Sequence, residues 1–293
     1  MSLELFTDVV GEDRQHPIYR RLKSPRFEPE RRLLCEWSEG FVDRDGKFVQ
    51  EFQISFESCL WELYLNACFR QFGISTDFSY PAPDFLVGDA GRVVCVEATV
   101  SQPAQGGPAA FGYPADAIPR DFNEFNAAAM LRICNSFSSK LAKYRGSYRS
   151  LPHVKDRPFV IAIGAYDRPY AHFAAHRPML GALYGLYFDE EATMAAQAPN
   201  VVRYPVAAVR KSELTNVPLG LFADDACHDV SAVIYSCLAT WGKVRALADN
   251  PKEAITFTAF RPNPAGLDPL IEVKTNVEYE EDLLDGLYVF ENP

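Results

Sequence analysis

Two acidic residues lie in a pattern that can bring their carboxylates to one point. Asp84 follows a proline and opens a short apolar run, and Glu97 lies inside a second apolar run over residues 93–100. The turn between the runs, residues 88–91, is short and glycine-rich, so the runs are expected to pair as a hairpin. Two carboxylates held side by side repel one another unless a cation lies between them. The spacing therefore predicts the paired acids that a divalent-metal phosphodiesterase needs.

The second run has the period of a β-strand. Alternate residues of a strand share a face, so Val93 to Thr99 in steps of two point one way and Val94 to Val100 the other. Glu97 is then the one charge within a stripe of apolar or neutral side chains. This position marks Glu97 as a candidate functional residue.

The Pro-Asp dipeptide that contains Asp84 and the run Glu97-Ala98-Thr99 together resemble the signature of the PD-(D/E)XK nuclease superfamily. Members of that superfamily have the restriction-endonuclease-like fold. The resemblance covers about residues 52–164. The family usually has a lysine two residues after the glutamate, whereas this chain has Thr99 there.

The resemblance implies a set of metal ligands and a substrate. Asp84, Glu97 and the backbone carbonyl of Ala98 are expected to bind Mg²⁺ or Mn²⁺, because hard oxygen ligands suit these ions. Thr99 is expected to contact the substrate, which would be nucleic acid, with DNA as the first expectation. A homodimer is also compatible with the resemblance.

Residues 54–72 are expected to form a helix that ends at Gly73. Apolar residues occur nearly all the way round this helix, so it should be buried between other layers. Glu57 and Glu62 are separated by roughly 140° around its axis, so only one of them can face a shared site. The resemblance favours Glu62 as a metal ligand, directly or through water, because family members often carry an acid about three turns before this glycine. Glu57 remains the alternative.

Residues 121–145 are expected to form a long helix with Asp121 as its N-cap and Gly146 at its end. Lys140 falls in the middle of the apolar face of this helix, where an unpaired ammonium group would be costly. Lys143 lies about 80° from the centre of that face, so it is expected to face the surface or contact a backbone phosphate of the substrate.

Lys140 could supply the positive charge that Thr99 does not. If the helix packs over the hairpin, as the corresponding helix does in the family, Lys140 points toward Asp84 and Glu97 and is neutralised by them. The Lys140-x-x-x-Tyr144 spacing resembles the Gln-x-x-x-Tyr helix of the exonuclease branch, and Tyr144 would contact a phosphate or hold Lys140. The alternative is a structural ion pair, or a lysine that reaches past the core to solvent.

The order of the expected elements predicts the fold class. A short strand is expected around residues 77–80, and residues 157–164 form an apolar run typical of a buried strand. The resulting α-β-β-β-α-β order is that of the restriction-endonuclease-like core, an α/β fold with a mixed central sheet flanked by helices. A Pro/Gly-rich loop over residues 103–120 lies beside the acids and is a candidate lid or substrate-contacting segment.

Three parts are expected along the chain. Residues 1–50 would form an N-terminal extension with a hairpin turning at Asp45-Gly46. Residues 51–165 would form the nuclease-like core, and residues 166–293 a C-terminal α/β extension packed on it. The extension should contain a helix over residues 178–186 and strands over residues 204–210, 230–236 and 255–260.

Composition limits the partners and the compartment. The chain has 293 residues and a formal net charge of -10, which argues against broad non-specific nucleic-acid binding. Its 7 cysteines include no Cys-x-x-Cys pair, so reduced thiols are expected. No apolar stretch approaches the roughly 20 residues of a membrane span, so a soluble, cytoplasmic protein with no membrane partner is expected.

Three functions are compatible with these residues. The favoured one is a metal-dependent nuclease in which Asp84 and Glu97 bind the metal and Lys140 replaces the usual lysine. The second is a catalytically inactive nuclease-fold protein that binds nucleic acid or another protein, which Thr99 and the acidic balance favour. The third is a sugar hydrolase that uses Asp84 and Glu97 as general acid and base.

Overall fold

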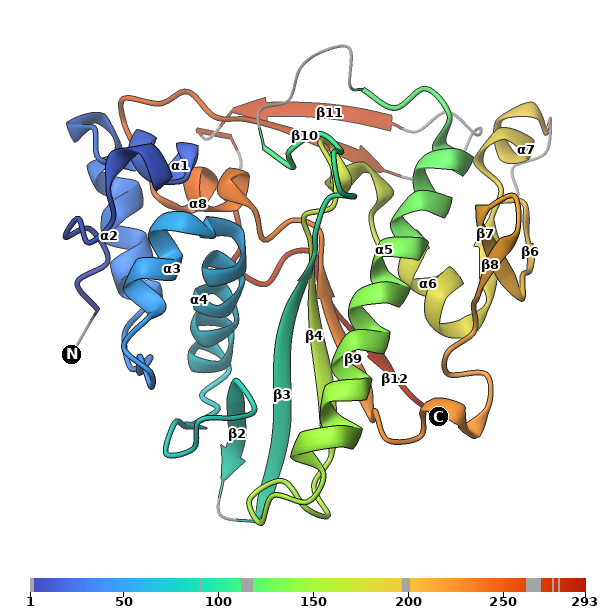
Figure 1. Ribbon diagram of the computed structural model, residues 1–293. Helices are drawn as coiled ribbons and strands as arrows, with labels where there is room; N and C mark the ends of the chain where they lie inside the picture. Colours follow the sequence, from blue (N-terminus) through green and yellow to red (C-terminus); the bar gives the residue numbers. More distant parts are fainter. Residues whose placement is uncertain are drawn as a thin grey trace.

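The computed structural model describes residues 3–89, 91–111, 118–196, 201–261, 270–275, 277–278 and 280–293. Within them, a mixed sheet of six strands forms the centre of an α/β fold, with helices on both faces (Figure 1). β3, β4 and β9 run parallel, whereas β1, β2 and β12 join by antiparallel pairing. In spatial order the strands are β1 (Thr76–Asp77), β2 (Phe85–Asp89), β3 (Arg92–Ser101), β4 (Phe159–Ala165), β9 (Ala232–Ser236) and β12 (Leu287–Glu291).

The predicted hairpin is confirmed as the pair β2 and β3. Phe85 lies opposite Val96, so the residue that opens the first strand comes next to the middle of the second. Gly88 has a φ of 133°, and a Cβ atom there would lie 1.9 Å from the carbonyl oxygen of Arg92. Only glycine fits this close approach. Ala90 of the predicted turn lies outside the described residues.

Alternation along β3 divides its side chains between two cores. Even-numbered residues pack with α4 (Phe56–Gln71), and Cys95 packs with α5 (Phe122–Lys143) and α6 (Arg177–Tyr184). α4 and α5 accordingly lie on opposite sides of β3 (Figure 1). The predicted strand faces are confirmed, and Glu97 lies on the side covered by α5.

Both long helices form close to the expected ranges, with differences at their ends. α4 stops before Gly73, which has a φ of 68°, and the backbone turns at Ser55 to separate α4 from α3 (Phe48–Ile54). The Asp121 side chain caps α5 by accepting a hydrogen bond from the Glu124 N–H, as predicted. Gly146 does not end the helix, because the chain continues into a π-helical turn, η4 (Tyr144–Tyr148).

The expected N-terminal hairpin at Asp45-Gly46 is wrong. Among residues 40–49 the structure has a bend followed by the first turn of α3. The Asp43 carboxylate accepts hydrogen bonds from the backbone N–H groups of Lys47 and Phe48, so it caps a helix and does not begin a strand pair. Gly46 provides the turn with a φ of 72°. The Asp-Gly signal therefore marked a helix entry.

Residues after 166 add strands to the central sheet and cover its α5 side. β9 pairs with β4 in parallel, and β12 pairs with β9 on the outer edge. The run expected over residues 204–210 is divided between two separate strands. The remaining elements are η5 (Ala171–Ala174), β5 (Leu186–Phe188), α7 (Glu190–Ala195), β6 (Arg203–Pro205), β7 (Ala208–Ser212), β8 (Thr215–Pro218), η6 (Asp225–Cys227), β10 (Thr256–Arg261) and β11 (Leu270–Thr275).

Two further observations concern the expected loop and the membrane. Residues 112–117 of the expected lid lie outside the described residues. None of the described helices has the length and apolar character needed to cross a membrane.

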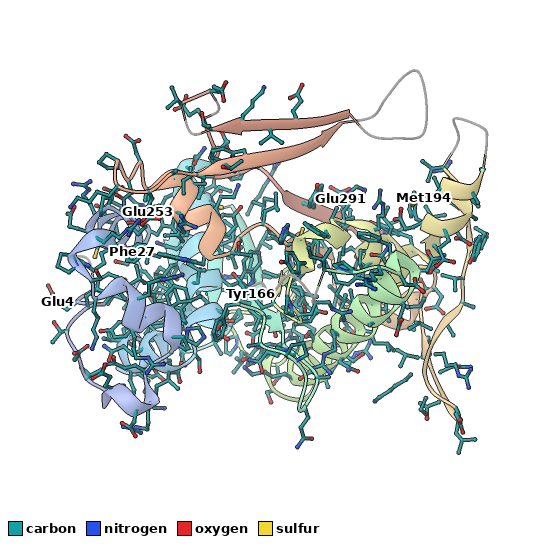
Figure 2. All side chains as sticks on the ribbon, turned by 90° about the horizontal axis from the view of Figure 1, so that it is seen from above. Glu4, Phe27, Tyr166, Met194, Glu253 and Glu291 are labelled. Carbon is teal, nitrogen blue, oxygen red and sulfur yellow. The ribbon has the colours of Figure 1, made fainter. Side chains whose placement is uncertain are left out.

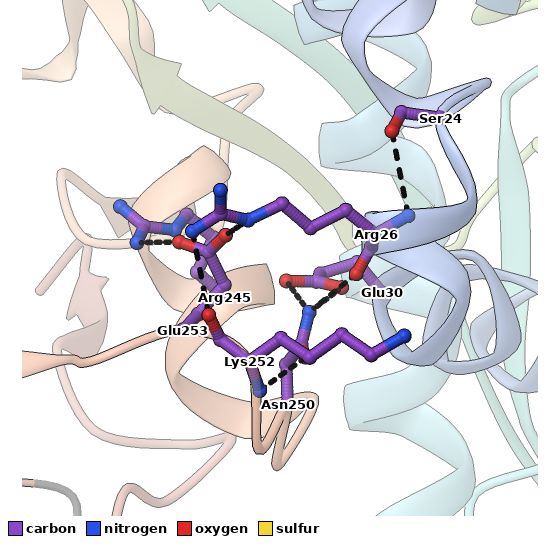
Figure 3. A network of polar contacts seen from close by, with 7 residues as sticks. All are labelled: Ser24, Arg26, Glu30, Arg245, Asn250, Lys252 and Glu253. Atoms are coloured by element: carbon purple, nitrogen blue, oxygen red, sulfur yellow. Dashed lines mark hydrogen bonds and ion pairs between the residues drawn. The ribbon is translucent and has the colours of Figure 1, made fainter.

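The N-terminal helices are tied to the C-terminal half through a polar network. η1 (Glu12–Arg14), α1 (Pro17–Leu22), η2 (Pro25–Phe27) and α2 (Glu28–Trp37) precede α3, and α8 (Trp241–Leu247) follows β9. Figure 2 marks Phe27 and Glu253 in the two segments that meet, and Arg26 forms an ion pair with Glu253. Figure 3 shows Asn250 donating to both oxygens of the fully buried Glu30, at 3.0 and 2.8 Å.

Removal of the Asn250 amide should destabilise the fold. In Asn250→Ala, Glu30 stays buried without this donor, which costs on the order of 1–3 kcal/mol of unfolding free energy. Denaturant unfolding measures the change. Lys252→Ala is the matched control, because Lys252 joins the network only through its backbone. Equal stability of Asn250→Ala and the parent protein would show that the network does not hold α2 in place.

Candidate functional site

A pocket of about 440 Å³ lies between α4, β3 and α5. Its polar lining contains most of the residues that the sequence singled out. They are Glu62, Asp84, Glu97, Ala98, Thr99, Lys140 and Lys143, and Arg132 joins them. The structure thus collects residues from four separate elements of the chain at one place.

The end of β2 explains why the pocket lies at the edge of β3. Strand pairing stops at Phe85, so the next inward-facing N–H of β3, that of Ala98, has no strand partner. The Asp84 carboxylate takes that place, with Oδ2 2.7 Å from the Ala98 nitrogen. Since the N–H and C=O groups of a strand residue point to the same edge, the Ala98 carbonyl faces the Asp84 side.

Glu97 is fully buried and makes its contacts through one oxygen. Oε1 lies 2.8 Å from the Lys140 amine, 2.9 Å from the Lys143 amine and 3.4 Å from the Tyr148 hydroxyl. Oε2 is buried and has no hydrogen-bond partner among the described residues. A buried carboxylate is costly unless it is paired, so these two lysines make its burial possible.

Lys143 lies closer to the site than the sequence indicated. Its side chain is half exposed, yet its amine contacts Glu97 directly and lies 4.9 Å from the centre of the Tyr148 ring. Burial acts to lower the pKa of Lys143, but the contacts with Tyr148 and Glu97 outweigh it and raise the pKa above its usual range. Residues three apart share a helix face, so Lys140 and Lys143 reach one oxygen together.

Tyr144 does not line the pocket. It is buried, and its ring stacks on Phe159 with ring centres 4.1 Å apart. The expectation for Tyr144 assumed a regular α-helix, in which it would lie one turn after Lys140. The π-helical turn changes the register, so Tyr148 rather than Tyr144 contacts Glu97.

Asp84 and Glu62 are electrostatically coupled. Burial raises the pKa of Asp84 to about 6, and the Glu97 carboxylate adds to the rise, whereas Lys140, the Ala98 N–H and Arg44 oppose it. Burial and the Asp84 carboxylate raise the pKa of Glu62 well above its usual range. Glu57 points elsewhere, with its carboxylate 3.2 Å from His16. Of the two helix acids, the structure therefore brings Glu62 to the pocket.

Arg44 is a site residue that the sequence reasoning missed. One of its terminal nitrogens, Nη1, donates to the carbonyls of Tyr80 and Pro83 at 2.9 and 2.8 Å. Nη2 lies 3.8 Å from the Asp84 carboxylate. The residues around Arg44 were expected to form an isolated hairpin, so no signal in the sequence connected it with Asp84.

The donor set was compared with what a divalent cation requires. Among the described residues, no three Asp, Glu, His or Cys side chains form a group that could hold a metal ion by themselves. Mg²⁺ needs less, because it retains several waters and uses one or two carboxylates together with substrate phosphates. Asp84 and the unpartnered Oε2 of Glu97 fit this requirement. Glu62 can join only through a water molecule.

Comparison with known proteins adds no relative. No protein-family model, no curated protein and no solved structure matches the chain. The chemistry of the pocket therefore has to be argued from its own residues.

The raised pKa of Asp84 predicts that this carboxylate destabilises the metal-free protein at neutral pH. A folded-state pKa of about 6, above the model value of 3.8, means that the folded state binds the proton more tightly. Stability therefore falls as pH rises from about 4 to 6 and stays lower above it. Asp84→Asn should raise the unfolding free energy at pH 7.5 by about 1–3 kcal/mol, and the gain should disappear near pH 4.

Asp77→Asn is the matched control for this experiment. Hydrogen bonds from Ser79 lower the pKa of Asp77, so the same substitution on neighbouring β1 should not stabilise the protein at pH 7.5. Thermal unfolding of both variants across this pH range measures the difference. A stability gain for Asp84→Asn that does not depend on pH would contradict the repulsion between Asp84 and Glu97.

Proposed function

We propose that this chain is a divalent-metal-dependent nuclease of the PD-(D/E)XK type, which hydrolyses phosphodiester bonds in nucleic acid, with DNA as the first expectation. The main support is the buried Glu97, held by Lys140 and Lys143 beside Asp84 at the open edge of β3. The element order α4-β1-β2-β3-α5-β4 supports a restriction-endonuclease-like core.

The residues divide into metal ligands and groups that act on the phosphate. Asp84, Oε2 of Glu97 and the Ala98 carbonyl would hold Mg²⁺ or Mn²⁺, with Glu62 behind a water molecule. When bound, the cation lowers the pKa of a coordinated water and stabilises charge on the phosphate. Lys140 orients the attacking water and balances the negative charge that develops on the phosphoryl oxygens.

The position of Lys140 accounts for Thr99 at the usual lysine position. A side chain two residues after Glu97 lies on the same strand face as Glu97, and α5 packs over that face. An amine on α5 therefore enters the same volume as an amine on residue 99 would. The 2.8 Å contact of Lys140 with Glu97 is consistent with this replacement.

The local charge of the site favours an anionic substrate in spite of the acidic chain. Arg132, Lys140 and Lys143 line the pocket, and Arg44 lies behind Asp84. Clustered positive groups in a cleft concentrate anions even where the net charge of the protein is -10. Arg132 also donates to the carbonyls of Gln102 and Pro103, which anchors the loop at the rim of the pocket.

A binding module without catalytic activity is the second candidate. One observation favours it: two lysines already compensate the charge of Glu97, so the fold does not need a cation at that residue. The same lysines would bind a phosphate backbone. Binding of Mn²⁺ at the acids separates the two candidates, because only the nuclease requires it.

The nuclease proposal predicts loss of cleavage when either acid is neutralised. Asp84→Asn and Glu97→Gln should each reduce Mn²⁺-dependent cleavage of DNA by 100-fold or more, on the order expected when a catalytic metal loses a ligand. Glu57→Gln is the control, since Glu57 pairs with His16 outside the pocket. Cleavage by Asp84→Asn at the parent rate would reject the proposal, and calorimetric titration with Mn²⁺ shows whether the ligands are lost.

The two lysines should have separable effects. Lys140→Met should lower kcat by roughly 100-fold with little change in KM, because its amine acts on the reacting phosphate. Lys143→Met should mainly raise KM and reduce the salt dependence of binding by about one unit of slope, because its half-exposed amine contacts the substrate backbone. Identical effects of the two variants on kcat and KM would contradict this division.

A further inference from the structure

A stacked aromatic pair lies beside the loop that carries Asp84. The rings of Tyr80 and His153 have centres 3.8 Å apart and are inclined by 12°. Tyr80 precedes β2, and His153 belongs to the segment between η4 and β4. The Tyr80 side chain is 39% exposed although His153 covers one of its faces, so its other face and edge are open to solvent.

The loop that carries the pair is held by hydrogen bonds on both sides. His153 Nε2 lies 2.7 Å from the Ala82 carbonyl, to which it donates. Arg44 donates to the Tyr80 and Pro83 carbonyls, and the same guanidinium lies 3.8 Å from Asp84. The ring is therefore fixed in orientation, and one arginine connects its position with that of Asp84. A ring fixed in advance loses little entropy when a ligand stacks on it.

The pocket itself has no open aromatic face in its lining among the described residues. Trp61 is the one aromatic residue in that lining, and it is fully buried with its indole N–H bonded to the Ala162 carbonyl. The rest of the lining supplies charged and hydrogen-bonding groups suited to a phosphate backbone. Recognition of a base next to that phosphate requires an aromatic surface outside the pocket.

We propose that the Tyr80 ring, backed by His153, stacks on an unpaired nucleobase adjacent to the phosphate bound at Asp84 and Glu97. This inference rests on the proposed function for the identity of that phosphate. In a duplex the faces of each base are covered by its neighbours, so stacking on Tyr80 selects a single-stranded or locally unpaired substrate. Every base has such a face, so this contact gives a preference for strand state without a sequence preference.

Binding of short oligonucleotides in EDTA tests the stacking without cleavage. The probes are a fluorescein-labelled single-stranded DNA of mixed sequence and the same strand with abasic sugars throughout. Tyr80→Leu should weaken binding of the normal strand by at least about fivefold and leave the abasic strand unchanged. Tyr80→Phe, which keeps the ring, should bind both strands like the parent protein.

Tyr204→Leu is the matched control, because Tyr204 is 44% exposed and packs beside Tyr187 on strands outside the central sheet. It should bind both strands like the parent protein. The inference is overturned if Tyr80→Leu weakens both strands equally, which indicates a structural role, or if it weakens neither. It is also overturned if the parent protein binds normal and abasic strands with equal affinity.

Cleavage in Mn²⁺ separates failure of this inference from failure of the proposed function. Base-dependent binding through Tyr80 without any cleavage would reject the nuclease and retain the stacking site. Metal-dependent cleavage of single strands and duplexes at equal rates, unchanged in Tyr80→Leu, would retain the nuclease and reject the stacking site. The expected result is faster cleavage of single strands by the parent protein, with that preference reduced at least about fivefold in Tyr80→Leu.

Discussion

The burial of the Glu97 carboxylate is the constraint on which the rest of the site depends. A fully buried carboxylate requires compensation, and this one receives it from Lys140 and Lys143 through a single oxygen. That requirement fixes the rotation of α5 over β3 and leaves Oε2 without a partner. Asp84 adds a second negative charge beside it, which raises the pKa of Asp84 to about 6. The pocket is therefore preorganised for a cation or an anion bridged by one.

The position of Asp84 depends on parts of the chain that are remote in sequence. Its carboxylate binds the Ala98 N–H, and Arg44 holds the preceding loop from the N-terminal side. The N-terminal segment is in turn attached to the C-terminal half through Glu30 and Asn250 (Figure 3). The site is thus supported from both ends of the chain, although its acids come from one hairpin.

Much of the core could be predicted because its signals are local. The period of β3, the glycine turn after β2, the Asp121 cap and the apolar run of β4 each depend on neighbouring residues, and each appears in the structure. The hairpin expected at Asp45-Gly46 failed for the same reason. An Asp-Gly pair signals a turn, but whether strands or a helix follow depends on what Asp43 caps.

The sequence by itself determined which residues share a strand or helix face, and so it placed Asp84, Glu97 and Lys140 as partners across two elements. Only the tertiary structure decided the contacts that depend on packing and on irregular backbone. The π-helical turn exchanged Tyr144 for Tyr148, and the loop before β2 brought Arg44 to Asp84 and Tyr80 to His153. Periodicity describes regular elements, whereas these contacts arise where regular elements end and distant segments meet.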